Sequence, residues 1–467
     1  MQTTGRVLRK SDAWSSRSGF ILAAVGSSIG LGNLWRFTYV TGEAGGGIFV
    51  LLYLAFTLLF ALPLLAAEFA IGRRSGHSAI ESVQAVARAS RASELWGGAA
   101  WLGSMSSFFI LTFYCVISSW IVAFLVLGLS ADYSAASGGE AAVEAASMRF
   151  DRVTSNVPVM LSCLGGFVGM VSLVVGLGVK RGIERVSLVL TPVFFVLLIS
   201  LLGFAALDGD FPAALSFIVD IRTENFTYAM MLEALGQSFF ATGVGACAMM
   251  TYGAYLPRDT NIGGSASLIA GADTVVALVS ALTVFSLVFA TGGDPGAGPG
   301  LFFIMLPVGF DALPLGELFG GVFFLIALLA ALASAISLME VSVSWLDERT
   351  GVTRGGAAAG LGFAIFMIGA GYLFSRDYIV FMDFLTASIM LPLAGGATAF
   401  FCGWVVDRAI MEAELGPRIY RVWSVIVRWI IPTVIAAAIG LGVPDKLQNQ
   451  GWIELPGVLL NVFGPNR

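Results

Sequence analysis

Long runs of apolar residues, separated by short polar segments, dominate the chain. A helix needs about 20 apolar residues to cross the hydrocarbon core of a bilayer. The pattern therefore predicts an all-α membrane protein with eleven transmembrane helices. The expected spans are residues 17–40, 46–71, 100–129, 157–179, 186–207, 229–256, 264–290, 317–345, 355–374, 378–406 and 421–443.

The two ends of the chain do not match the pattern of a membrane span. Residues Met1 to Trp14 are polar and basic, and the apolar run after them is too long for the core of a cleaved signal peptide. The tail from Trp452 to Phe463 is apolar but short and contains a proline, so we expect it to lie at the membrane interface.

Charge between the spans predicts the orientation in the membrane. Basic residues gather before the first span and after the second, fourth, eighth and tenth, whereas the other connections carry mainly acids. Because cytoplasmic loops are enriched in Lys and Arg, we expect a cytoplasmic N-terminus in the inner (plasma) membrane. Eleven spans then leave the C-terminus on the extracytoplasmic side.

Composition narrows the function classes further. Charged residues make up 12% of the chain, against roughly 25% in ordinary globular domains. The net charge of −5 is dispersed without a basic patch, which argues against nucleic acid as a partner. Four scattered cysteines and the single histidine, His77, offer no cluster of metal ligands, and no pairing of a nucleophile with a base indicates an enzyme.

Two of the predicted spans are interrupted near their middle by small residues. The first contains the stretch from Gly26 to Asn33, and the sixth contains the stretch from Ala241 to Ala246. Non-helical backbone at membrane depth is tolerated only where protein or a polar cavity satisfies it. Interruptions at corresponding places in two halves of a chain indicate the central binding site of a secondary transporter.

Several charged residues lie within or at the ends of apolar segments. Arg36, Glu68, Asp273, Glu340 and Asp383 are of this kind. Such residues are costly in lipid and usually face a pathway or a partner. For Glu68 a second interpretation stands beside this one, namely that its carboxylate caps backbone groups of a neighbouring helix break.

Short motifs in sequence order resemble the neurotransmitter:sodium symporter family. They comprise Trp14 to Leu22, Gly26 to Phe37, Gly45 to Gly47, Gly236 to Phe240, Thr251 to Tyr255 and Gly298 to Phe303. The resemblance implies two inverted five-helix repeats with broken helices 1 and 6, followed by an eleventh helix. The implied divisions are residues 1–16 (cytoplasmic segment), 17–207 (first repeat), 208–228 (extracellular loop), 229–406 (second repeat) and 407–467 (eleventh helix and extracellular tail).

The resemblance also implies where a substrate amino acid binds. Its carboxylate would lie against the backbone amides near Leu31 and Gly32 and against the Tyr114 hydroxyl. Gly30 stands where amine carriers of the family have an aspartate, which favours a substrate that brings its own carboxylate. The side-chain pocket would consist of Ile110, Phe240, Gly243, Ala246, Ser334 and Leu338.

Two sodium sites carry over from the family in part. The first would use Ser28, Asn33, Ala241, Asp273 and the substrate carboxylate, although the family has a hydroxyl at the position of Ala241. The second would use Gly26, Ile29, Ala330 and Ser334, with Ala333 in place of a further polar ligand. Each site thus lacks one usual oxygen, and coupling to one or two sodium ions is expected. The carboxylate of Asp273 would repel a nearby anion, so we expect no chloride requirement.

Gates on either side of the site are implied as well. Arg36 and Asp383 match the family's outer gate, and Glu348 matches the acid of the inner gate, with Trp14 and Tyr255 nearby. The family's arginine partner of that acid corresponds to Ser11 here, and Arg9 or Lys10 would have to replace it.

Taken together, the sequence predicts a sodium-coupled importer of a neutral, hydrophobic or aromatic amino acid that works by alternating access. A sensor on the same fold that binds without transport, and a carrier with proton coupling or no coupling, are the alternatives. The identity of the amino acid, the ion stoichiometry and the oligomeric state are left open.

Overall fold

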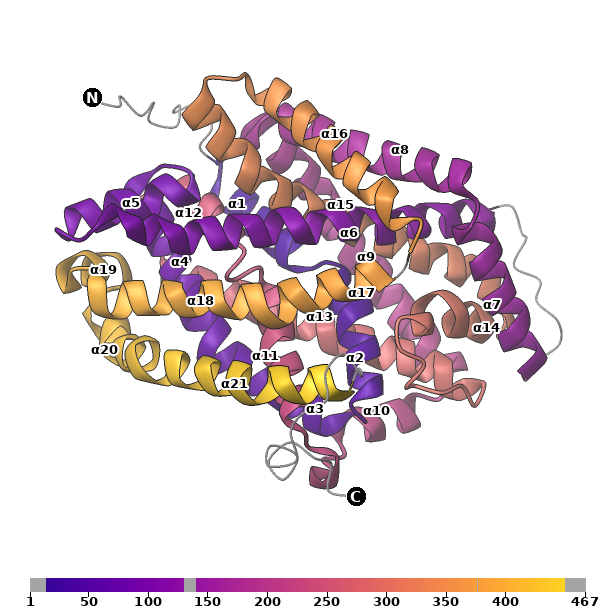
Figure 1. The fold of residues 1–467 in the computed structure, drawn as a ribbon. Coiled ribbons are helices and arrows are strands. Elements are labelled where there is room, and N and C mark those ends of the chain that lie inside the picture. The colour runs from indigo at the N-terminus through magenta and orange to yellow at the C-terminus, as the bar shows by residue number, and fades with distance from the viewer. Residues whose placement is uncertain (1–13, 130–139, 376, 450–467) are drawn as a thin grey trace.

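A computed structural model describes residues 14–129, 140–375 and 377–449 of the chain. Its elements are helices, which form one bundle (Figure 1). The first predicted span is broken as expected. Helix α1 (Arg17–Ser28) ends at the interruption, and the π-helical turn η2 (Gly32–Arg36) continues into α2 (Phe37–Glu43). The two halves are bent by 41°.

Nine helical stretches within the described ranges are long and apolar enough to cross a membrane, and the bent pair above brings the number to ten. The nine are α3–η3–α4 (Gly47–Ser75), η4–α6 (Glu94–Leu127 of a helix that reaches Leu129), α8 (Val157–Gly176), η5–α9 (Val179–Asp208), α13 (Ile262–Ala290), α15 (Gly316–Thr350), α16 (Arg354–Tyr372), α17–η8–α18–η9 (Asp377–Val405) and α20–η10–α21 (Pro417–Gln448 of a helix that reaches Asn449).

The sixth predicted span is absent from that number because its break leaves two short pieces. These are α11 (Tyr228–Thr242) and α12 (Ala248–Ala254). Between them the backbone takes positive φ at Gly243 (70°), Gly245 (79°) and Cys247 (61°). Glycine adopts this left-handed region without steric cost, whereas a residue with a Cβ such as Cys247 does so uncommonly. Eleven complete spans therefore remain a prediction.

Shorter helices occupy the connections. The segment 208–228, expected to be a loop, contains α10 (Phe211–Val219) and the 3-10 turn η6 (Thr223–Asn225). The others are α5 (Ala79–Ala89), α7 (Glu140–Thr154), η7 with α14 (Leu301–Met305 and Leu306–Asp311) and α19 (Arg408–Leu415). The tail from Trp452 to Phe463 lies outside the described residues.

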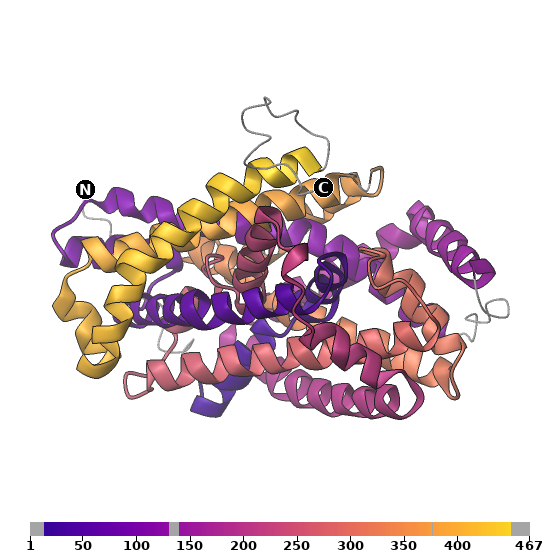
Figure 2. The same ribbon diagram turned by 90° about the horizontal axis from the view of Figure 1, so that it is seen from below.

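Burial separates inner helices from peripheral ones. In the apolar windows of α6 and α15, 78% of the residues are buried, against 28% in α16 and in α20–α21. The peripheral helices expose large apolar side chains such as Phe363, Met367, Val422 and Trp429. Figures 1 and 2 show α21 in yellow along one outer side of the bundle, with α8 and α16 on the opposite side in Figure 1. Exposed apolar faces of this kind suit contact with lipid.

Candidate functional site

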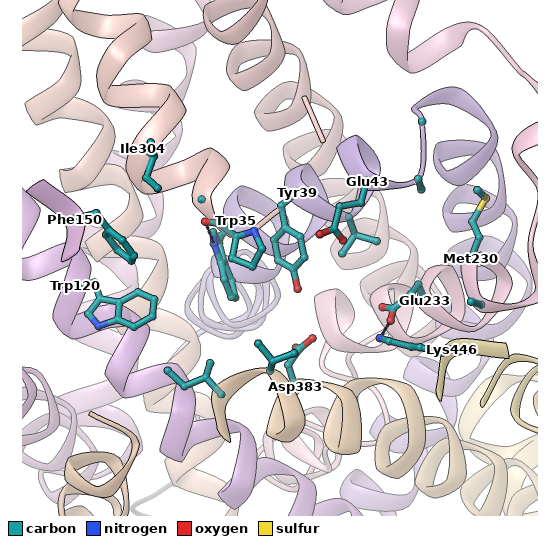
Figure 3. Close-up of a pocket in the computed structure, with 18 of the residues that line it drawn as sticks. Trp35, Tyr39, Glu43, Trp120, Phe150, Met230, Glu233, Ile304, Asp383 and Lys446 are labelled. Carbon is teal, nitrogen blue, oxygen red and sulfur yellow. Dashed lines mark hydrogen bonds and ion pairs between the residues drawn. The ribbon is translucent and has the colours of Figure 1, made fainter. Parts of the chain in front are cut away.

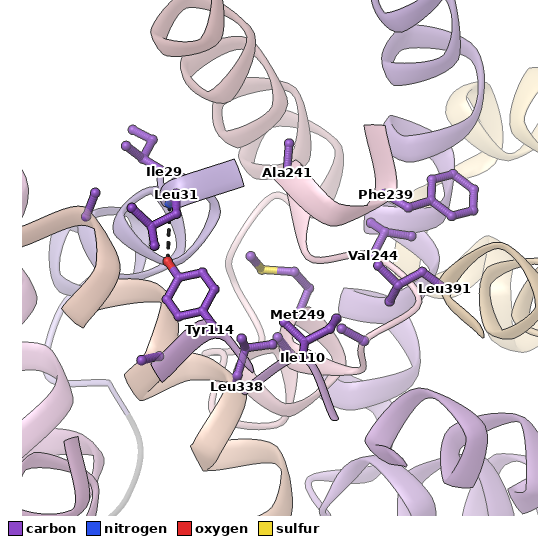
Figure 4. Packing of buried hydrophobic residues seen from close by; sticks show 14 of the residues in the cluster. Ile29, Leu31, Ile110, Tyr114, Phe239, Ala241, Val244, Met249, Leu338 and Leu391 are labelled. Atoms are coloured by element: carbon purple, nitrogen blue, oxygen red, sulfur yellow. Dashed lines mark hydrogen bonds between the residues drawn. The ribbon is translucent and has the colours of Figure 1, made fainter. Parts of the chain in front are cut away.

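The two helix breaks lie together and enclose a small pocket at the centre of the bundle. The volume of this pocket is about 30 Å³, which is room for two or three water molecules. Eight of the nine predicted substrate residues line it, namely Gly32, Ile110, Tyr114, Phe240, Gly243, Ala246, Ser334 and Leu338. Figure 4 shows several of these residues with the apolar neighbours that surround them. Residues from α6, α11 and α15 thus converge on the broken backbone.

Leu31, the ninth predicted residue, takes part through its backbone. Its amide N–H donates a hydrogen bond to the Tyr114 hydroxyl at 3.2 Å, as drawn in Figure 4. On the other side of the pocket, the Ser334 hydroxyl donates to the Ser27 carbonyl at 2.9 Å. The first break therefore brings backbone polar groups to the pocket, where a bound carboxylate or ammonium group can use them.

Close packing around the first break requires glycine at two positions. A Cβ atom at Gly30 would collide with the Ser334 hydroxyl and come within 3.1 Å of the Tyr114 hydroxyl. A Cβ atom at Gly32 would lie 2.9 Å from Cδ1 of the Phe240 ring. Any larger side chain there would displace residues that form the pocket.

The structure adds pocket residues that the sequence analysis did not name. Ser27, Ala248, Ser337 and Leu391 also line the pocket. Ser337 follows Ser334 by three residues on the same helix, and residues with this spacing share a helix face. This spacing could have identified Ser337 as a pocket residue from the sequence. Leu391 and Ala248 come from helices whose position only the tertiary structure gives.

The predicted first cation site is a buried cluster of oxygen-bearing side chains. Nδ2 of Asn33 donates to the Asp273 carbonyl at 2.9 Å and to Oδ1 of its carboxylate at 2.8 Å. The Tyr53 hydroxyl donates to Oδ2 of Asp273 at 3.0 Å. Oδ1 of Asn33 is buried and has no hydrogen-bond partner among the described residues. Since buried polar atoms are normally paired, this oxygen suits a cation ligand.

The two remaining predicted ligands of the first site lie in the same region. Ser28 lines the central pocket, and its hydroxyl donates to the Val25 carbonyl at 3.0 Å. Ala241 is buried near the end of α11, beside the break.

The predicted second cation site coincides with a separate cavity of about 10 Å³, the space of about one water molecule. Gly26, Ile29 and Ala330 line it together with Ala333. Ser334, the fourth predicted ligand, lines the central pocket instead. Thr191 of α9 lines the cavity and was not predicted. Its hydroxyl donates to the Leu22 carbonyl at 3.1 Å.

The predicted outer gate is closed by direct contact. Nε of Arg36 lies 3.0 Å from Oδ1 of Asp383. The same guanidinium contacts Oε2 of Glu233 at 2.7 Å and Oε1 of Gln237 at 2.8 Å, and it lies 5.6 Å from the centre of the Phe240 ring. Arg36 is fully buried. An arginine that holds two carboxylates and an amide joins η2, α11 and α17 across the entrance to the pocket.

Beyond this gate lies a large vestibule of about 1060 Å³ (Figure 3). Aromatic side chains of Trp35, Tyr39, Trp120 and Phe150 form part of its wall. Its charged lining includes Glu43, Asp151, Glu233, Asp383 and Lys446. The sequence analysis missed Glu233 and Lys446. Glu233 lies four residues before Gln237 on the same helix face, whereas Lys446 follows the expected end of its span at residue 443.

The predicted inner-gate residues fall into two clusters rather than one. Nε1 of Trp14 donates to the Tyr252 carbonyl at 3.3 Å, and its ring packs edge-on against Tyr255. The Tyr255 hydroxyl donates to Oε1 of Glu340 at 2.9 Å, and Glu340 also pairs with Arg354.

Glu348 belongs to the second cluster. Its carboxylate accepts from Nδ1 of His77 at 2.5 Å and from the backbone N–H of Ser78 at 2.8 Å. The hydrogen bond to Glu348 raises the pKa of His77 above its usual value, while partial burial acts in the opposite direction. The candidates Arg9, Lys10 and Ser11 lie outside the described residues. The partner that the structure provides is thus the single histidine of the chain.

The bundle and its site define a class of protein. Two broken helices enclose a pocket, a buried ion pair closes it on one side, and separate polar clusters lie on the other side. This is the architecture of a multi-pass secondary transporter with a central binding site. A family model described as the sodium:neurotransmitter symporter family matches residues 11–152 and 148–439. The chain belongs to this family of sodium-coupled transporters.

Individual relatives agree with this assignment. An uncharacterized sodium-dependent transporter of Bacillus subtilis, YhdH, is 33% identical over 440 residues, which cover 90% of this chain and 95% of that protein. The sodium-dependent neutral amino acid transporter B(0)AT2 of Bos taurus is 25% identical over 59% of this chain and 40% of its own length. The crystal structure of MhsT in complex with L-phenylalanine superposes with a TM-score of 0.85, at 34% identity, over 92% of this chain and 99% of that one.

Proposed function

We propose that the protein imports a neutral amino acid with a hydrophobic or aromatic side chain, together with sodium, by alternating access. The observation that carries the proposal is the convergence of eight predicted residues on one pocket between the two breaks. The Leu31 amide and the Tyr114 hydroxyl, 3.2 Å apart, would exchange their mutual hydrogen bond for bonds to the substrate carboxylate.

The pocket wall supports an apolar substrate side chain. Ile110, Phe240 and Leu338 offer apolar surface, and Gly243 and Ala246 occupy little space. The relative MhsT was crystallised with L-phenylalanine, which agrees with a substrate of this type. A whole amino acid is larger than the space of about 30 Å³, so the walls must move apart when it enters.

Sodium would bind beside the substrate. Its ligands at the first site would be the free oxygen of Asn33, Asp273, and backbone oxygens of Ser28 and Ala241. The substrate carboxylate would complete the ligand shell of the sodium ion. Binding of the amino acid and binding of sodium would therefore be coupled, because each completes the other's site. The cavity of Gly26, Ile29 and Ala330 would hold a second ion.

Chloride is not expected to take part. The Asp273 carboxylate already supplies a negative charge beside the first site, and a nearby anion would be repelled. The hydrogen-bond donors that an anion would need are also engaged. The Tyr53 hydroxyl donates to Asp273, and Nε2 of Gln237 donates to the Gly32 carbonyl at 2.7 Å.

Alternating access follows from the two closed sides. With a cytoplasmic N-terminus, the Arg36–Asp383 gate faces outward and the Glu348 cluster faces inward. Binding of substrate and sodium would favour the occluded state, since a ligand shifts conformations only through its differential affinity. The broken helices and their neighbours α3–α4 and α13 would then rock against the rest of the bundle.

The test is uptake of labelled phenylalanine, leucine and tyrosine into proteoliposomes that hold the purified protein. An inward sodium gradient should drive accumulation, and replacing chloride by gluconate should not change it. Tyr114→Phe should reduce uptake, whereas the control Tyr372→Phe, whose hydroxyl contacts Thr112 at 3.1 Å on α6, should not. Uptake driven by a proton gradient alone would contradict sodium coupling. Binding without accumulation would favour the sensor.

A further inference from the structure

Glu233 connects the outer gate to the eleventh predicted span. Oε2 of Glu233 lies 2.7 Å from the Arg36 guanidinium, and Oε1 forms an ion pair with Nζ of Lys446, drawn in Figure 3. Lys446 lies near the end of α21, and its ammonium group is 5.0 Å from the centre of the Phe384 ring. Both side chains of the pair are largely buried, with exposed fractions of 14% and 15%.

Lys446 supplies the second positive charge in this cluster, beside Arg36, while Glu43 of the same vestibule adds a further acid that interacts electrostatically with both cations. Arg36 contacts two carboxylates, those of Asp383 and Glu233, and Glu233 contacts two cations. Without Lys446, Arg36 alone would have to compensate both acids. Its guanidinium would then be drawn toward Glu233 at the expense of Asp383.

A neighbouring contact fixes α21 to the same helix. Oδ2 of Asp445 accepts the backbone N–H of Ala229 at 2.7 Å, in the first turn of α11. The first N–H groups of a helix have no partner within the helix, so the carboxylate caps it. Two successive residues of α21 therefore hold α11 at its first turn and at Glu233.

We propose that Lys446 is a positioning residue of the outer gate. By neutralising Glu233 it leaves Arg36 free to hold Asp383, so the eleventh predicted span determines how firmly the entrance closes. This inference rests on the proposed function in one respect, that Arg36 and Asp383 separate when the site opens outward.

The test measures access to the pocket without any substrate. A reporter cysteine replaces Ile110, which lines the pocket beneath the gate, in intact cells that express the full chain. A membrane-impermeant methanethiosulfonate reagent is added outside, and the labelling rate is followed. The parent without the reporter controls for the native cysteines. The variants are K446M, E233Q and the two combined, with K446R as the conservative replacement. R222M, which removes an exposed ion pair with Asp220, is the matched control.

Lys446→Met should raise the labelling rate about tenfold, which corresponds to about 1.4 kcal/mol. Glu233→Gln in the same chain should return the rate to near that of the reporter parent, because the competing acid is then gone. Glu233→Gln alone, K446R and R222M should not label faster than the reporter parent.

Two results would overturn the proposal. One is a labelling rate of Lys446→Met equal to that of the reporter parent. This result would overturn the proposal even if the melting temperature falls, since Lys446 would then contribute only to the packing of α21. The other is a double variant that labels as fast as Lys446→Met. If Lys446→Met does not fold, faster labelling by Glu233→Gln alone also contradicts it. Failure of amino-acid uptake would leave these labelling results unchanged and would count against the proposed function instead.

Discussion

One buried polar atom without a partner among the described residues lies where a cation is expected. Oδ1 of Asn33 is buried without a hydrogen bond in the described part of the chain, while its amide nitrogen holds Asp273. Leaving a buried acceptor unpaired costs about 1–3 kcal/mol, so such an atom is retained where something binds it. A sodium ion that accepts this oxygen as a ligand would remove the cost.

Asp273→Asn should weaken sodium binding about tenfold, because the substitution keeps the shape but removes the negative charge beside the ion. The measurement is the sodium concentration that half-saturates binding of a labelled amino acid to the purified protein. Thr283→Val, on the same helix α13, is the control, since the Thr283 hydroxyl donates to the Val279 carbonyl of its own helix. An unchanged sodium dependence in Asp273→Asn would remove Asp273 from the site.

Helix breaks require partners for the backbone groups that they expose. Glu68 on α4 supplies them at the second break, where its carboxylate accepts the N–H groups of Gly245 at 2.8 Å and Met250 at 3.2 Å. The capping interpretation of Glu68 thus describes its contacts. The break is held open by a residue nearly 180 positions away in the sequence.

Glu68→Ala should lower the melting temperature of the purified protein, because hydrogen bonds to a charged group contribute about 1.5–3 kcal/mol. Glu68→Gln keeps one acceptor oxygen, so its melting temperature should lie between those of Glu68→Ala and the parent. Glu81→Ala, which removes an acid paired with the exposed Arg349 at 3.5 Å, is the control. Equal melting temperatures for Glu68→Ala and Glu81→Ala would contradict the capping role.

The turn between α4 and α5 is tied to α15 by His77, a group whose charge depends on pH. The charged groups around His77 are Glu348 of α15 and, on its own side, Glu81 and Arg88 of α5. The pKa of His77 is raised in the folded protein, so the folded state binds the proton more tightly than the unfolded state. This contribution is complete below the unfolded pKa of about 6.5 and is lost as the pH rises through the folded value.

His77→Gln should therefore reduce thermal stability most below the unfolded pKa of about 6.5, relative to the parent, and by less as the pH rises through the folded pKa. Melting curves of both proteins across this range give the difference. A difference that is constant with pH would show that the ring contributes by packing and not by its charge.

Across the whole molecule, the proposed cargo sites lie between elements that would separate in the proposed mechanism. The pocket is enclosed by α6, α11, α12 and α15 together with the first break, and the gate joins η2, α11 and α17. No single helix contains a site. A cation bound at such a junction stabilises the assembled bundle by binding to the folded state.

Sodium should accordingly raise the melting temperature of the purified protein relative to choline at equal ionic strength. One ion at a concentration about a hundred times its Kd adds about 2.7 kcal/mol to the free energy of unfolding. Asp273→Asn should lose most of this increase and Thr283→Val should keep it. Identical melting curves in sodium and choline would contradict a sodium site in the parent.

The sequence by itself determined the membrane class, the position of most spans and both helix breaks. The reason is physical: an apolar run of sufficient length has few alternatives to a membrane helix, and clustered glycines mark where the helix is interrupted. The resemblance to the family supplied the predicted substrate residues, eight of which line the central pocket. Span ends were less well predicted, as for the span expected to begin at residue 100, whose helical stretch begins at Glu94, because a helix continues past the apolar core into polar sequence.

Only the tertiary structure decided the pairings between distant residues. His77 and Glu348 are 271 positions apart in the sequence, and the residues around either one give no indication that the other is its partner. The same holds for Lys446 at Glu233 and for Thr191 at the small cavity. Which charges meet depends on how helices are rotated and how far their ends extend. Packing of the whole bundle fixes both, because a buried charge is stable only where another element brings its partner.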